Sequence, residues 1–289
     1  MAARSRLLTV RVRKPFLLWI FVVSHAKKER LMIVESRNPD LKYPRHVREE
    51  KVMLVLDWLL EFRFSSIPIL AARLGQTAVN ANRFFRGMLD DGLIQAFANV
   101  HTKHYRYVML TSAGVSYLEA EGRDVSKAVV RTARLGRYSR IIHDLSVQAC
   151  LVRNLDEYSE VIYERNLDYD SQERPDAVVV SKKHGYSIAI EFERWRKDRK
   201  RILQVLVQHA DNLIKKRYSG VYYYFEHDAD RAHYQKIFNE PVWPAYKKQA
   251  KTGKVVKTGR GDFRPDEVQN LRRVFVFRHA PVKGDQIGG

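Results

Sequence analysis

The sequence predicts a mixed α/β (α+β) protein with two domains behind a basic leader. The 289 residues are 45% hydrophobic, which is enough for two packed cores and too much for a disordered chain. A helical repeat and two short strand-like runs come first, and helices alternate with strands from about residue 138 onward. We therefore expect a leader over 1–47, a first domain over 48–125, a second domain over 126–280 and a flexible tail over 281–289.

The charge balance indicates a polyanionic partner. Lys and Arg number 52 against 33 Asp and Glu, a formal net charge of +19, and DNA or RNA is the usual partner of such a surplus. A surface that is merely basic and solvated is the alternative. RNA has less support because no RRM or KH pattern occurs, and without a P-loop an ATPase is not expected.

Two further features bear on the compartment. Cys150 is the single cysteine, so neither a disulfide framework nor a cysteine zinc site is expected, which fits a reducing cytoplasm. In the leader, basic residues precede the apolar run 16–23, as in a signal peptide, but the run is too short to span a bilayer. The run is alternatively a buried strand or helix, or translation starts at Met32. We expect a cytoplasmic protein without stable membrane insertion.

The first domain begins with a helical pattern from Arg48, in which apolar residues recur at three- and four-residue spacing through Leu60. Ser65 and Ser66 precede a second, short helix through Leu74. Thr77 is a good N-cap for a third helix, which reaches Leu89. Strand-like runs over 93–97 and 105–110 then flank a basic hairpin turn, and Thr111 begins another helix.

This order is that of a winged helix-turn-helix module, in which the third helix enters the major groove and the hairpin contacts the backbone. The polar face of the third helix and the hairpin supply the residues expected to contact DNA: Asn80, Asn82, Arg83, Arg86, Lys103 and Arg106. A helical domain for protein contacts or dimerisation is the alternative.

The second domain is predicted to carry carboxylates on adjacent strands. A helix over 138–158 and a strand over 161–163 precede Asp176, the strand 177–180, a polar turn and the strand 187–192, which together predict an antiparallel hairpin. Strand alternation places Glu191 and Glu193 on one face, and Asp176 opens the neighbouring strand. Three such carboxylates would suit Mg²⁺ or Mn²⁺. Solvated carboxylates paired with nearby arginines are the alternative.

Cations follow the second strand directly. Arg194, Arg196 and Lys197 belong to a basic stretch that begins the helix over 202–215, and they are expected to hold the scissile phosphate and stabilise the transition state. Farther on, the sequence predicts a strand over 220–225, a helix over 229–238, a mobile basic loop over 247–264 and a last strand over 274–277.

The pattern of Pro175-Asp176, a strand and then Glu191-Phe192-Glu193 resembles the PD-(D/E)xK nucleases of restriction enzymes. The wider order resembles the replication-relaxation group, which includes MobC-type relaxases of mobilisable plasmids. It includes His143-Asp144-Leu145 in a helix, Tyr163-Glu164-Arg165, Arg174-Pro175-Asp176 and the block 191–197, behind a winged helix. The resemblance covers about residues 48–225 and depends on the order of short motifs.

The resemblance implies a bacterial relaxase or nickase that cuts one DNA strand at an origin of transfer with Mg²⁺ or Mn²⁺. Asp176, Glu191 and Glu193 would hold the metal, Lys197 would stabilise charge, and His143 or Asp144 would complete the site. Partners implied are double-stranded DNA, a relaxosome accessory protein and a conjugative coupling protein, and a homodimer is allowed. One departure is that Glu193 occupies the usual lysine position, and Lys197, one turn into the next helix, is expected to replace it. The alternative is a non-catalytic replication or transcription regulator on a nuclease-like scaffold.

Overall fold

The computed structural model describes residues 44–98, 107–135, 138–168, 174–249, 252–282 and 287. The chain divides into two compact units, Met1–Glu49 and Glu50–Gly289. The described part of the first unit is the start of one helix, so almost all of the expected leader lies outside the described residues. The second unit contains everything that follows, and its two parts are called the first lobe (50–120) and the second lobe (138–279).

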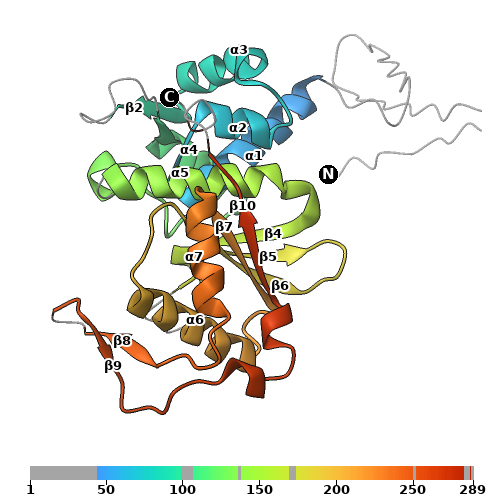
Figure 1. The fold of residues 1–289 in the computed structure, drawn as a ribbon. Helices are drawn as coiled ribbons and strands as arrows, with labels where there is room; N and C mark the ends of the chain where they lie inside the picture. Colours follow the sequence, from blue (N-terminus) through green and yellow to red (C-terminus); the bar gives the residue numbers. More distant parts are fainter. Residues whose placement is uncertain are drawn as a thin grey trace, which may run out of the picture. The chain divides into compact units, whose positions relative to one another are not determined.

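The first lobe consists of helices around a small antiparallel sheet (Figure 1). Three helices come before a β-hairpin, and a short strand joins the edge of that hairpin in the order β1-β3-β2. A fourth helix follows the hairpin. The elements are α1 (Pro44–Phe62), β1 (Phe64–Ser66), α2 (Ile67–Arg73), α3 (Ala78–Asp90), β2 (Ile94–Phe97), β3 (Tyr107–Leu110) and α4 (Ser112–Ala120).

Side-chain caps begin two of these helices, as the sequence predicted. Thr77 accepts a hydrogen bond from the Asn80 amide at the start of α3, and Thr111 accepts one from the Gly114 amide at the start of α4. Ser66 precedes α2 but makes no side-chain cap. Its backbone instead belongs to β1, a three-residue strand that was not predicted because its partner, β3, is far away in the sequence.

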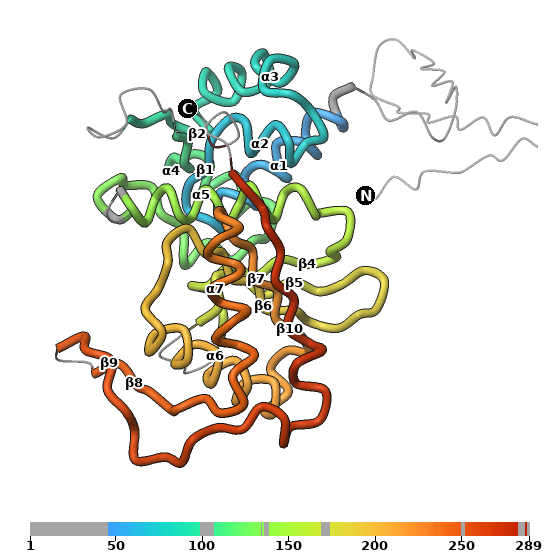
Figure 2. The backbone as a smooth tube through the Cα atoms, viewed as in Figure 1, coloured from blue at the N-terminus to red at the C-terminus, as the bar shows by residue number. Residues whose placement is uncertain are grey.

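The second lobe is a five-stranded mixed sheet in the order β10-β7-β6-β5-β4. Strands β4, β5 and β6 are antiparallel neighbours, whereas β7 is parallel to both β6 and β10, and Figure 2 follows the path of β10 beside β7. The elements are α5 (Tyr138–Arg153), β4 (Tyr158–Tyr163), β5 (Ala177–Ser181), β6 (Ser187–Glu193), α6 (Arg199–Ile214), β7 (Gly220–Phe225), α7 (Asp228–Phe238) and β10 (Phe275–His279).

Helices cover both faces of this sheet. Alternate residues of β6 point to opposite faces, so Ile190 and Phe192 share a buried cluster with Cys150 of α5. Ala189 lies in a different cluster, with Leu206 of α6. The face assignment of β6 made from the sequence is therefore confirmed, and the molecule is mixed α/β.

The two lobes share a core. Buried residues of α1, α3 and β3 belong to the same cluster as buried residues of α5, β5 and β6. The Trp58 indole donates to Gln148 Oε1 at 2.9 Å, and the Gln148 amide donates to the Phe64 carbonyl at 3.0 Å, so a buried polar chain joins the lobes. The boundary expected near residue 125 falls between α4 and α5, and both sides of it belong to one compact unit.

Two segments near the C-terminus differ from expectation. The segment 247–264 was predicted as a mobile loop, but it includes an antiparallel pair, β8 (Tyr246–Lys248) and β9 (Val255–Lys257). Trp243, fully buried, bridges to Phe263 and closes this segment against the lobe. Most of the expected flexible tail lies outside the described residues, yet Ile287 is described and is buried. Over the described ranges, none of the helices is long and apolar enough to cross a membrane.

Candidate active site

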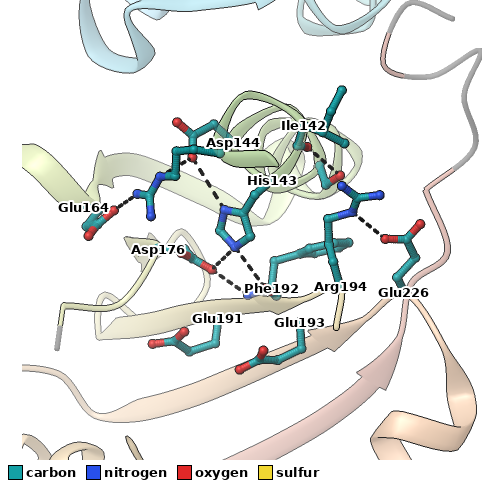
Figure 3. Close-up of polar contacts among 12 residues, drawn as sticks. Ile142, His143, Asp144, Glu164, Asp176, Glu191, Phe192, Glu193, Arg194 and Glu226 are labelled. Carbon is teal, nitrogen blue, oxygen red and sulfur yellow. Dashed lines mark hydrogen bonds and ion pairs between the residues drawn. The ribbon is translucent and has the colours of Figure 1, made fainter. Parts of the chain in front are cut away.

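Asp176 lies one residue before β5, where the hairpin partner β6 ends. Its carboxylate Oδ2 accepts a hydrogen bond from the Phe192 amide at 2.8 Å, so the side chain is tied to β6 (Figure 3). Burial raises the pKa of Asp176, while nearby His143 acts in the opposite direction. The first carboxylate of the predicted triad is therefore held rigidly at the end of the central hairpin.

His143 reaches Asp176 from α5. Its Nε2 is 3.5 Å from Asp176 Oδ2 and 3.2 Å from the Phe192 carbonyl oxygen. Burial disfavours the imidazolium, but Asp176 and Asp144 outweigh it and raise the pKa of His143 to about 9. His143 therefore carries positive charge beside Asp176 at neutral pH.

Asp144 faces away from the carboxylates of β6. It is fully buried and pairs with Arg63 at 2.8 Å and with Arg140, one helical turn earlier on α5, at 2.9 Å. Its Oδ1 also lies 3.5 Å from Nδ1 of His143. Of the two residues expected to complete the site, His143 therefore contacts Asp176, and Asp144 acts from behind it.

Glu191 and Glu193 point together toward α6, as strand alternation predicted (Figure 3). Glu191 Oε1 is 3.0 Å from Nε2 of His209 on α6, and Glu193 Oε1 accepts from Lys197 Nζ at 2.6 Å. Burial raises the pKa of Glu191 to about 8; Lys197 opposes this shift and Glu193 adds to it. Burial also raises the pKa of Glu193. Each of the two carboxylates has its own hydrogen-bond partner, but the charge of Glu193 still acts on Glu191.

Lys197 lies before the next helix, not one turn into it. Asp198 is the N-cap of α6 and accepts from the Arg201 amide, so Lys197 belongs to the preceding turn. From there its ammonium group reaches Glu193, and the charges of Glu193 and Glu191 raise the pKa of Lys197 although burial lowers it. Lys197 reaches back to the strand, as expected, but its assignment to the helix was wrong.

These side chains line one cavity of about 260 Å³. Asp176, Glu191, Lys197 and His143 are on its wall, whereas Glu193 stands behind Lys197. The lining residues are Arg140, His143, Glu164, Arg174, Asp176, Glu191, Lys197, Arg201 and Val205. The cavity thus combines carboxylates with cations, which is the composition that phosphoryl chemistry requires.

The donor set suits a hard divalent cation in part. Asp176 and Glu191 offer carboxylate oxygens, the ligands that Mg²⁺ and Mn²⁺ prefer, and burial leaves both carboxylates with raised pKa values that a cation would lower. The carboxylate of Glu193 is already paired with the ammonium group of Lys197. Among the residues that the structure describes, no three His, Cys, Asp or Glu side chains form a group that could hold a metal. The predicted three-carboxylate group is therefore not found among the described residues, and Asp176 and Glu191 are the carboxylates of the predicted set that line the cavity.

The expected DNA contacts divide into three groups. Asn80, Asn82, Arg83 and Arg86 are all exposed on α3. Lys103 and Arg106 lie outside the described residues. Arg194 pairs with Glu226 at 2.6 Å and Arg196 with Asp230 at 2.8 Å, so both are engaged within the protein and not extended toward the cavity.

Five residues that line the cavity were not predicted as part of the site: Arg140, Glu164, Arg174, Arg201 and Val205. Arg140 pairs with Glu164 as well as with Asp144, and the spacing of Arg140 and Asp144, four apart on a helix, was a signal in the sequence. Glu164 and Arg174 belong to two of the short motifs that carry the resemblance, but neither was assigned to the site.

No protein-family model, curated protein or solved structure matches this chain.

Proposed function

We propose that the protein is a metal-dependent DNA endonuclease that binds a specific DNA site and cuts one strand, as a plasmid relaxase does at an origin of transfer. The observation that carries this proposal is that Asp176, Glu191 and Lys197, from three separate segments, line one cavity. Carboxylates and a lysine at the edge of the β5–β6 hairpin are what metal-dependent phosphodiester cleavage needs. The second lobe is interpreted as a PD-(D/E)xK-type nuclease domain.

Within that cavity the residues take distinct roles. Asp176 and Glu191 would hold Mg²⁺ or Mn²⁺, which when bound polarises the phosphate and lowers the pKa of a coordinated water. Lys197 is oriented by Glu193 at 2.6 Å and presents positive charge to the phosphate as negative charge develops on it. His143 keeps Asp176 in place and adds positive charge on the α5 side.

The first lobe is interpreted as a winged helix-turn-helix that reads the DNA. Asn80, Asn82, Arg83 and Arg86 on the exposed face of α3 are the residue types that contact base edges and phosphates in the major groove. The net charge of +19 supports a polyanionic partner. An accessory protein, a coupling protein and a second copy of the chain remain proposed partners.

One observation favours a non-catalytic regulator instead. The carboxylates of Asp176, Glu191 and Glu193 all have protein partners, and the described residues contain no group of three metal ligands. A DNA-binding protein could use the same network only to stabilise its fold. Both functions require DNA binding, so the deciding measurement is cleavage.

The test is nicking of a supercoiled plasmid that carries the DNA neighbouring the protein's own gene. Wild type with Mg²⁺ or Mn²⁺ should produce open circles, and EDTA should prevent them. Asp176→Ala should abolish nicking while DNA binding, measured by gel shift, persists. Glu119→Ala, an exposed carboxylate on α4, is the matched control and should nick like wild type. Binding without nicking in either metal would leave the regulator.

A further inference from the structure

A second cavity adjoins the candidate active site. Its volume is about 420 Å³, and it is lined by Arg63, Leu135, Arg140, Tyr163, Glu164, Arg165 and Arg174. We call it the arginine pocket. Arg140, Glu164 and Arg174 line both cavities, so the arginine pocket and the cavity of Asp176 and Glu191 share a wall.

The lining of the arginine pocket is mostly cationic, with four arginines and one carboxylate, Glu164. Carboxylates outside the lining also act on these arginines: the buried Asp144 pairs with Arg63 and Arg140, and the charge of Glu61 raises the pKa of Arg165. Arg165 donates to the backbone carbonyls of Glu61, Leu60 and Lys127, which carry no charge. Burial lowers the pKa of Arg165, and the charge of Arg63 lowers it further, so these two guanidinium groups repel each other.

Arg174 is the group that remains available for a ligand. It is half-buried and lines both cavities. Within the described ranges, no hydrogen bond or ion pair is found for its guanidinium group, whereas Arg63, Arg140 and Arg165 are all engaged. An arginine with no partner among the described residues, in a concave site lined by other arginines, is suited to bidentate contact with a phosphate.

We propose that the arginine pocket binds the phosphate next to the scissile phosphate on the strand that is cut, and that Arg174 makes this contact. This inference rests on the proposed function, because the adjoining cavity is where the scissile phosphate would lie. The cavity of Asp176 and Glu191 is lined by both carboxylates and cations. The arginine pocket, with four arginines and one carboxylate in its lining, would attract a phosphate without any metal. A strand would therefore be held in register before the metal is present.

The test measures binding in EDTA, so that cleavage plays no part. Fluorescence anisotropy with a fluorescein-labelled oligothymidylate, repeated over a series of salt concentrations, gives the slope of log K against log salt. Losing one phosphate contact on a single strand lowers the magnitude of that slope by about 0.7. Arg174→Gln should show this decrease together with weaker binding. Arg174→Lys should restore the slope because it keeps the charge.

Arg231→Gln is the matched control. Arg231 is on α7 and lines neither cavity. The substitution removes the same charge as Arg174→Gln, and it should leave the slope unchanged. An unchanged slope in Arg174→Gln, with an unaltered circular dichroism spectrum, would overturn the proposal. A loss seen only with 5′-phosphorylated oligonucleotide would also overturn it, because the pocket would then bind a strand terminus. Since no metal is present, failure of the nicking assay alone does not produce either result.

Discussion

Arg63 offers the sharpest test of how the two lobes are held together. It follows α1 with a φ of 73°, the left-handed conformation that glycine adopts without cost and other residues do not. Its Nη2 nevertheless lies 2.8 Å from Oδ2 of Asp144, a fully buried residue of α5. The ion pair therefore explains why arginine and not glycine occupies this helix end.

The stability changes expected for substitutions of Arg63 follow from its ion pair and from its left-handed backbone. Arg63→Ala removes a hydrogen bond to a buried charge, worth about 1.5–3 kcal/mol. The free energy of unfolding should decrease by about 2 kcal/mol, because Asp144 remains paired with Arg140 at 2.9 Å. Arg63→Gly loses the same contact. It also removes the strain of the left-handed backbone, which stabilises the folded state by about 1–2 kcal/mol. The greater conformational entropy of glycine in the unfolded chain offsets about 0.4–1 kcal/mol of that gain. Glycine should therefore be the milder substitution.

Urea unfolding followed by tryptophan fluorescence gives the free energies of unfolding for wild type, Arg63→Ala and Arg63→Gly. Arg86→Ala, an exposed arginine on α3, is the control and should lie within about 0.5 kcal/mol of wild type. If Arg63→Ala is as stable as the control, the ion pair contributes nothing and the reasoning about Asp144 is refuted. If Arg63→Gly is less stable than Arg63→Ala, the backbone reasoning is refuted.

Two further predictions concern single buried positions. Burial raises the pKa of Glu191 to about 8, so the folded state keeps a proton that the unfolded state loses above its ordinary carboxyl pKa. In EDTA the free energy of unfolding should therefore fall between pH 5 and 8 by up to about 1.4 kcal/mol per pH unit, and Glu191→Gln should flatten this decline; parallel curves for the two proteins would contradict the assignment. Gly114→Ala should lower the Tm, because the added Cβ would lie 2.1 Å from the Leu93 carbonyl oxygen, whereas glycine-to-alanine changes inside helices usually stabilise by about 0.5–1 kcal/mol. Ser116→Ala, at an exposed position of the same helix, is the control for helix propensity, and a Tm for Gly114→Ala at or above wild type would show that the approach of α4 to Leu93 is not tight.

Much of the candidate site could be predicted because its chemistry depends on local pattern. Strand alternation alone placed Glu191 and Glu193 on one face, and the turn at 182–185 placed Asp176 near the end of the same hairpin. Their partners could not be predicted. His209 reaches Glu191 because α6 packs on that face of the sheet, and such packing depends on contacts between distant segments. Lys197 reaches Glu193 from the turn that connects β6 to α6.

The sequence by itself determined the mixed α/β class, the caps at Thr77 and Thr111, the β5–β6 hairpin and the surplus of positive charge. These depend on short-range periodicity, hydrogen bonds between near neighbours and composition. Only the tertiary structure decided that β1 joins β3, that both lobes share one core and that Arg174 lines two adjacent cavities. The physical reason is that strand pairing, burial and ion pairing over long sequence separations are set by how the whole chain packs, and no local pattern encodes them.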